Sequence, residues 1–127
     1  MSLSFREDRV RVVGFFKARP NFTPEEVRTK ALEMIATVKA FSIMQKNLLK
    51  YDVSFISNGS GGLVKALGLR ETEFCAMFVL EFGSHEQMHE TLTDPEYLKH
   101  LDSALQTITS REDLHLFPAE FLTVIDQ

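Results

Sequence analysis

The sequence has no tryptophan, one cysteine and no cluster of basic residues. A single cysteine excludes an intrachain disulfide bond. The 18 Asp and Glu residues outnumber the 14 Lys and Arg residues, which gives a net charge of -4. A nucleic-acid-binding surface needs cations clustered on one face, so this composition predicts no nucleic-acid partner.

Long apolar runs are missing as well. No uncharged stretch is long enough to cross a bilayer, and the charged residues from Arg6 to Arg11 interrupt any apolar core of a signal peptide. We therefore expect a cytoplasmic protein without a membrane partner.

The composition that is present is typical of one globular domain. Hydrophobic residues make up 44% of the chain and charged residues 25%. We expect a single domain over residues 1–127, with a short disordered N-terminus of about residues 1–7. The eleven phenylalanines bring a large apolar area without a polar group, which predicts an aromatic and apolar interior.

The segment from Glu73 to Phe82 is apolar on both sides. Because side chains alternate along a strand, one face carries Phe74, Ala76, Phe78, Leu80 and Phe82, and the other carries Cys75, Met77, Val79 and Glu81. A strand of this kind lies in the middle of a sheet that is covered on both faces.

The segment from Arg9 to Ala18 is apolar on both faces in the same way, which predicts a second central strand. A helix start follows it, where Thr23 caps, Pro24 takes the first helical position and Glu26 completes a capping box. Apolar residues at helical spacing extend this predicted helix to about Lys46.

Four further elements complete the pattern. They are an outer strand over Tyr51 to Ser57, a helix opening at Ser84 with Gln87 in a capping box, a helix restarting at Asp94-Pro95-Glu96, and a last strand over His115 to Ile125 that Pro118 restricts to an edge or bulge. The order strand, helix, strand, strand, helix, strand predicts a ferredoxin-like α+β fold, with an antiparallel sheet and helices on one face. Its other face would expose apolar side chains, so we expect two sheets to pair into a homodimer, a dimeric α+β barrel.

The segment from Asn58 to Thr72 is predicted to be a loop. Its glycines are followed by Leu63-Val64 instead of the Lys-Ser/Thr of a phosphate-binding loop, which disfavours phosphate binding. The apolar run from Leu63 to Leu69 is a candidate flap over a pocket.

Several short motifs share their order and spacing with a known family. They are Phe16-Lys17 before Pro20, Phe22-Thr23-Pro24-Glu25-Glu26, Leu49-Lys50-Tyr51, Asp94-Pro95-Glu96-Tyr97-Leu98 and Thr123-Val124-Ile125-Asp126. Through them the chain resembles, from about Arg9 to Asp126, the EthD-like members of the dimeric α+β barrel superfamily. The resemblance implies a homodimer with a pocket between sheet and helices in each subunit. It also implies relatives that are cofactor-free decarboxylases, dehydratases and cyclases acting on polyketides and other aromatic or dienone acids.

The chain departs from this family at two positions. Relatives commonly carry a histidine in the first helix, where this chain has Arg28, Thr29 and Lys30, and another in the second strand, where it has Phe55. Either the chemistry uses other groups, or the pocket binds without reacting.

Three residues are candidate catalytic groups. The carboxyl of Glu81, at the end of an apolar strand, would have a raised pKa if it were held among Phe side chains, and it could then serve as a general acid or base. The preferred interpretation is a strand-end carboxylate that points to water or pairs with a cation such as Arg11 or Lys17. Tyr51 and Tyr97 can donate hydrogen bonds to a ligand carbonyl, or can be core tyrosines whose hydroxyls are satisfied.

The predicted ligand contacts are made by five further residues: Phe16, Lys17, Phe55, Phe78 and Met77. Other reactive side chains have structural interpretations. His100, on the polar side of its helix, and His115 are predicted at the surface, and Cys75 is predicted to be a buried core thiol.

The residues His85-Glu86-Gln87-Met88-His89 match the HExxH pattern of zinc hydrolases. The match occupies the first turn of a short helix, Leu92 stands where the extended motif has glycine, and no third ligand is obvious downstream. An exposed polar helix start is the preferred interpretation of this motif.

The sequence therefore predicts a cofactor-independent lyase or cyclase that decarboxylates, dehydrates or cyclises a hydrophobic aromatic or polyketide-like acid in a Phe-lined pocket. The second candidate is a non-catalytic homodimer that binds the same kind of molecule. A zinc hydrolase acting through His85, Glu86 and His89 is the third.

Overall fold

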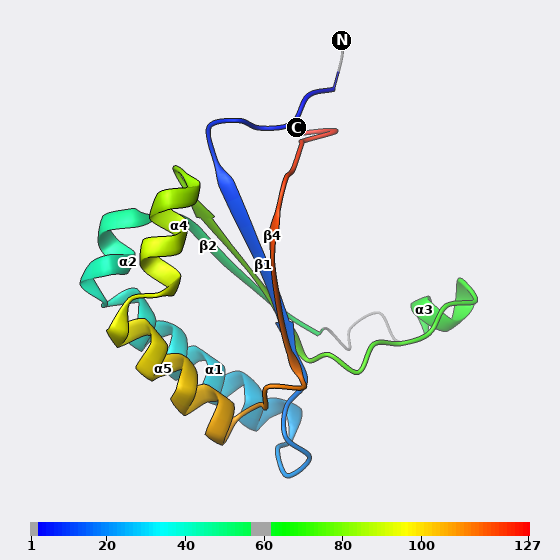
Figure 1. The fold of residues 1–127 in the computed structure, drawn as a ribbon. Helices are drawn as coiled ribbons and strands as arrows, with labels where there is room; N and C mark the ends of the chain where they lie inside the picture. Colours follow the sequence, from blue (N-terminus) through cyan, green and yellow to red (C-terminus); the bar gives the residue numbers. More distant parts are fainter. Residues whose placement is uncertain (1–2, 57–61) are drawn as a thin grey trace.

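The computed structural model describes residues 3–56 and 62–127. Its four strands form one antiparallel sheet of order β2-β3-β1-β4: β1 (Val10–Phe16), β2 (Leu48–Phe55), β3 (Ala76–Phe82) and β4 (Leu114–Ala119). A layer of helices covers one face of the sheet (Figure 1): α1 (Pro24–Lys39), α2 (Ser42–Asn47), α4 (His85–Leu92) and α5 (Pro95–Thr107). This is the predicted ferredoxin-like α+β fold.

Strands β1 and β3 are the central pair, as the sequence predicts. On the helix-facing side the core is formed by Val12, Phe16, Leu80 and Phe82, and Phe82 has no exposed surface. On the other side the side chain of Met77 is 43% exposed. The helices therefore cover only one of the two apolar faces, and we call the uncovered one the open face.

The predicted helix starts are confirmed. Thr23 and Glu26 exchange both hydrogen bonds of a capping box at the start of α1, and the Ser84 hydroxyl accepts from the backbone N–H of Gln87 at the start of α4. Asp94 accepts from two backbone N–H groups at the start of α5. Each cap satisfies backbone donors that a helix leaves unpaired, so these local signals fix where the helices begin.

The predicted continuous helix to about Lys46 is wrong. Helix α1 ends at Lys39, Phe41 is extended, and α2 starts at Ser42. The break lets the chain turn, so that Met44 and the side chain of Phe41 join the cluster formed by Val38 and Tyr97. The apolar spacing continues across this break, which is why periodicity alone did not reveal it.

The last strand is shorter than predicted. Strand β4 contains Pro118, which pairs with Val12 at the edge of the sheet as expected, but the strand ends at Ala119. The chain beyond it runs beside the N-terminal segment (Figure 1), where the Arg6 N–H donates to the Phe121 carbonyl at 2.8 Å. Residues 1 and 2 of the predicted disordered N-terminus lie outside the described residues.

The segment from Leu63 to Leu69, predicted as a candidate flap over a pocket, does not fold back onto the rest of the molecule. Helix α3 (Leu63–Ala66) projects away from the body of the molecule (Figure 1), and Leu63, Leu67 and Leu69 are each more than half exposed. Residues 57–61, which are Ser57 and the predicted glycine-rich loop up to Gly61, lie outside the described residues. No helix in the described ranges is long and apolar enough to cross a membrane.

Candidate functional site

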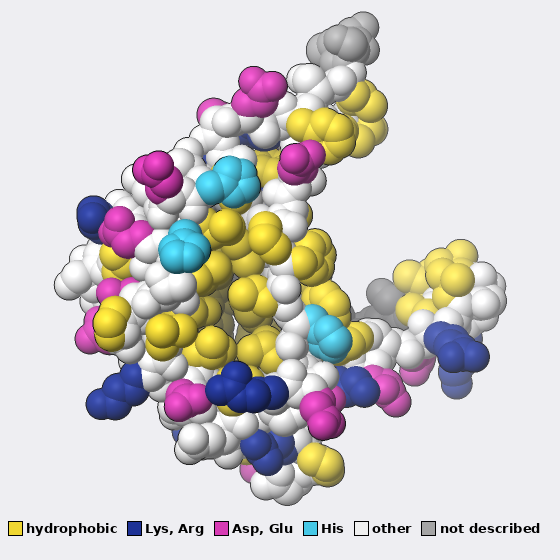
Figure 2. Space-filling model, viewed as in Figure 1, with side chains coloured by type: hydrophobic (Ala, Val, Ile, Leu, Met, Phe, Trp, Pro, Cys, Tyr) yellow, Lys and Arg dark blue, Asp and Glu magenta, His cyan; other side chains and the backbone are white. Residues whose placement is uncertain are grey.

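A cavity of about 110 Å³ lies between the sheet and helices α1 and α5. Figure 2 shows hydrophobic side chains lining a hollow between the helix layer and β4. Apart from His100 and the hydroxyl-bearing residues Tyr51, Tyr97 and Thr109, the residues that line the cavity are hydrophobic. The Thr109 hydroxyl already donates to the Lys17 carbonyl at 2.7 Å. Two tyrosines and one histidine therefore remain as reactive groups of the cavity.

Tyr51 enters the cavity from β2 and Tyr97 from the first turn of α5. Burial, and then the proximity of Tyr97, raises the pKa of Tyr51 to about 12. Burial also raises the pKa of Tyr97. Both phenols are therefore neutral O–H donors at neutral pH, and no hydrogen bond among the described residues engages either hydroxyl. Their role as donors to a ligand stays a prediction.

His100 follows Tyr97 by three residues on α5, so the two side chains lie on one face of the helix. It is half-buried, lines the cavity and packs edge-on against the ring of Phe41 at 5.8 Å between centroids. Burial lowers the pKa of His100, which favours the neutral imidazole. The prediction that His100 is a surface residue is wrong. The signal for it was the Tyr97-x-x-His100 spacing on a face shared with Leu101.

Four of the five predicted ligand contacts divide into two groups. Phe16 and Phe78 line the cavity. Lys17 instead forms an ion pair with Glu73 at 2.8 Å, and Met77 points to the open face, because it alternates with Phe78 along β3. These two residues therefore lie away from the cavity that the other two line.

Phe55 lies in a separate groove of about 440 Å³ at one end of α1. There the guanidinium of Arg28 lies 5.1 Å from the centre of the Phe55 ring. These are two of the positions at which relatives of the EthD-like family were expected to carry histidines. The contact is a cation over an aromatic ring, and it joins the two parts of the chain where the sequence resemblance would have placed histidines.

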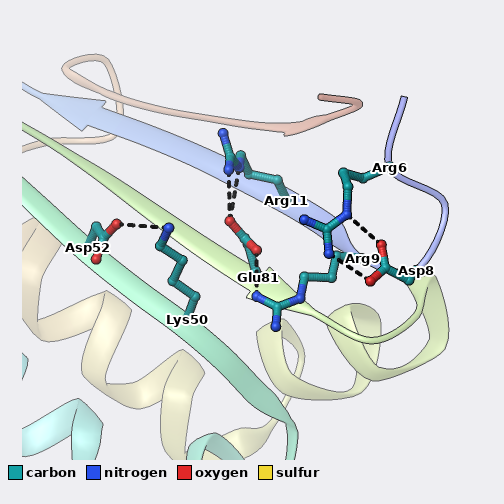
Figure 3. A network of polar contacts seen from close by, with 7 residues as sticks. All are labelled: Arg6, Asp8, Arg9, Arg11, Lys50, Asp52 and Glu81. Carbon is teal, nitrogen blue, oxygen red and sulfur yellow. Dashed lines mark hydrogen bonds and ion pairs between the residues drawn. The ribbon is translucent and has the colours of Figure 1, made fainter. Parts of the chain in front are cut away.

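Glu81 lies on the open face and not in the cavity (Figure 3). Its carboxylate accepts from Arg9 at 3.0 Å and from both nitrogens of the Arg11 fork at 3.2 and 2.8 Å, although the residue is only 2% exposed. Burial acts to raise its pKa, but the hydrogen bonds from Arg9 and Arg11 outweigh it, and the pKa of Glu81 is lowered. The raised pKa that a catalytic role would need is absent, and the preferred interpretation of a carboxylate paired with Arg11 is confirmed.

The zinc-motif residues His85, Glu86 and His89 are exposed at the start of α4. The described residues contain no group of three or more His, Cys, Asp or Glu side chains that could hold a metal ion. Cys75 is half-buried, its thiol donates to the Phe16 carbonyl at 3.2 Å, and burial raises its pKa. These side chains therefore add no reactive group to the cavity.

No protein-family model and no curated protein matches the chain. Solved structures match over nearly its whole length at low identity. A dimeric protein of unknown function and ferredoxin-like fold from Bacteroides fragilis is 19% identical, with a TM-score of 0.64 over 93% of this chain and 100% of that one. A hydroxynitrile lyase from Passiflora edulis is 10% identical, with a TM-score of 0.67 over 95% and 100%.

A third match is an ethyl tert-butyl ether d (ethd) family protein from Bacillus halodurans, 16% identical, with a TM-score of 0.55 over 89% of this chain and 98% of that one. At these identities the likeness establishes the fold. It does not assign the chain to a family.

Replacing Glu81 by Gln should lower the free energy of unfolding by about 1–3 kcal/mol at neutral pH, because two arginines lose their charged acceptor. The folded-state pKa of Glu81 is below its ordinary value of 4.5. Its stabilisation is therefore fully present above 4.5 and is lost as the pH falls through the lowered value. Urea unfolding of both proteins over this pH range measures the difference.

The matched control is Glu73→Gln, which removes the exposed partner of Lys17 and should change stability little. A Glu81→Gln protein as stable as the parent at neutral pH would show that the cluster of Figure 3 contributes nothing.

Proposed function

We propose that this protein is a cofactor-independent enzyme of the lyase or cyclase type, whose own side chains move a proton on a small unsaturated ligand held in the cavity. The observation that carries the proposal is the meeting of two neutral tyrosine hydroxyls and a half-buried imidazole in a cavity that is otherwise almost entirely apolar. The occurrence of a hydroxynitrile lyase among the structural matches supports an enzymatic role for the fold.

The three groups divide into a base and two donors. A neutral imidazole accepts a proton, and the lowered pKa of His100 keeps it in that form near pH 7. Tyr51 and Tyr97 donate hydrogen bonds to the oxygen on which negative charge develops as an enolate forms. In a largely apolar cavity such donors interact with a charged oxygen more strongly than in water, because the surroundings screen the interaction less.

The cavity limits the size and charge of the ligand. Its volume of about 110 Å³ is of the same order as the roughly 150 Å³ of a closed apolar cavity known to hold one benzene ring, and this cavity is partly open, so a ligand can extend beyond it. No Lys or Arg of the described residues lines it, so a carboxylate placed deep inside would lack a permanent cation. We infer a single-ring or similarly sized dienone ligand whose carboxylate, where it has one, lies at the mouth of the hollow.

A second candidate function is binding without turnover. It is favoured by the absence of histidine at Arg28, Thr29, Lys30 and Phe55, where relatives in the resembling family commonly carry it. The two functions separate in one experiment, in which single-ring aromatic and dienone acids are titrated into the protein and their conversion is followed. Saturable binding with no product from any ligand that binds would favour the second.

We also propose that the protein is a homodimer in which two open faces meet. Phe15, Val79, Met77 and Phe117 share this face by strand register, and Met77 and Phe117 are 43% and 45% exposed. Burying such apolar area between subunits is favourable. The matching Bacteroides fragilis protein is described as dimeric, which supports this assembly.

Replacing Tyr51 by Phe should reduce kcat for a converted ligand about a hundredfold, because one donor to the developing oxyanion is removed while the shape of the cavity is kept. The matched control is Ser54→Ala, on the same strand but on the open face. Steady-state kinetics on both variants measures the effect. Equal rates for Tyr51→Phe and the parent would remove Tyr51 from the mechanism.

The pH profile tests His100. If its neutral form is the base, kcat/KM should be flat above the ordinary histidine pKa of 6.5 and fall as the pH drops through the lowered pKa below that value. His100→Gln should abolish this acid limb together with most of the activity, whereas His115→Gln, on the open face, should keep both. A limb that survives in His100→Gln would assign the base elsewhere.

Replacing Met77 by Lys should convert the dimer to a monomer, because it buries a charge in the proposed interface. Light scattering should give twice the chain mass of 14.5 kDa for the parent and the chain mass for the variant. Leu32→Lys is the control, since Leu32 is 53% exposed on helix α1 and belongs to the helix layer. A parent that is monomeric at all concentrations would refute the assembly.

A further inference from the structure

Gly14 occupies the middle of the central strand β1 on its helix-facing side, where it pairs with Phe78 of β3 and Leu116 of β4. A glycine inside a strand contributes no packing, and it often marks a place where another group approaches the backbone closely. Here the approaching group is the ring of Phe78. A Cβ atom placed on Gly14 would lie 2.2 Å from the ring Cζ, 2.4 Å from Cε2 and 2.8 Å from Cε1.

The tip of the Phe78 ring therefore occupies the space that any side chain at position 14 would need. The ring extends from β3 across β1, so that its tip lies over Gly14 while the residue also lines the cavity. The ring tip thus lies over Gly14, beside the cavity that Tyr51 and Tyr97 also line.

We propose that Gly14, acting through the ring of Phe78, determines the size of ligand that the cavity accepts, and that the native pair admits one uncharged aromatic ring of phenol size. The proposal rests on the proposed function in treating the cavity as the ligand site. Its test measures binding alone, so it does not depend on turnover.

A methyl group at position 14 has a predictable effect on the ring. Backbone hydrogen bonds to β3 and β4 hold β1 on both sides, so β1 cannot move away from the ring of Phe78. The clashing atoms are the far end of a single side chain, which moves by rotation, and the space next to them is the cavity. Gly14→Ala should therefore fold normally with the ring turned into the hollow.

The experiment titrates phenol and 2-naphthol into four proteins: the parent, Gly14→Ala, Phe78→Leu and the double variant. Chemical shifts of Tyr51, Tyr97 and His100 report occupancy of the cavity.

The parent should bind phenol and discriminate against 2-naphthol. Gly14→Ala should weaken phenol binding about tenfold or more, and Phe78→Leu should strengthen 2-naphthol binding by a similar factor. In the double variant the shorter leucine side chain fits beside the added methyl group without entering the hollow, so phenol binding should return.

Val13→Ala is the matched control, because Val13 neighbours Gly14 on the strand but points to the open face, and phenol binding should not change. A folded Gly14→Ala that binds phenol like the parent would overturn the proposal. If Gly14→Ala does not fold, the single Phe78→Leu protein decides it, and unchanged 2-naphthol binding there would also overturn it. A Tyr51→Phe protein with full turnover would contradict the proposed function and leave this size discrimination standing.

Discussion

The structure depends on the strict alternation of side chains along β1 and β3. Because successive residues of a strand point to opposite faces, Phe78 and Leu80 contribute to the helix-covered layer while Met77, Val79 and Glu81 contribute to the open face. A shift of one residue in register would exchange these two sets. The same short stretch therefore builds both the wall of a largely apolar cavity and a surface that ends in an ion cluster.

The two faces treat ionisable groups in opposite ways, and one electrostatic rule explains both. In the cavity no counter-charge is available from the described lining, so burial favours the neutral forms of Tyr51, Tyr97 and His100. On the open face Glu81 is also buried, yet hydrogen bonds from Arg9 and Arg11 stabilise its charged form. Burial alone therefore does not decide the protonation state; the partners do.

This contrast marks what could be predicted from the sequence. Local signals succeeded: the capping box of Thr23 and the two-sided apolar strands depend on residues within a few positions of each other. The protonation of Glu81 depends on arginines 70 and 72 positions away, whose distance no local pattern reveals. His100 was misplaced because one polar residue at the border of a helical apolar face can belong to either side, and only the neighbouring Phe41 and the sheet decide which.

The cavity combines a close contact in its wall with hydrogen-bonding groups in its lining. Protein interiors are packed almost as densely as organic crystals, and an empty apolar space is destabilising because its lining loses contacts. The ring of Phe78 is one of the side chains that could turn into this space, and under our proposal a larger residue at position 14 would force it to do so. In the native chain the ring of Phe78 lies over Gly14. The cavity beside it is lined by the neutral phenols of Tyr51 and Tyr97 and by the imidazole of His100. A mostly apolar cavity that contains a few hydrogen-bonding groups has the physical properties of a binding site.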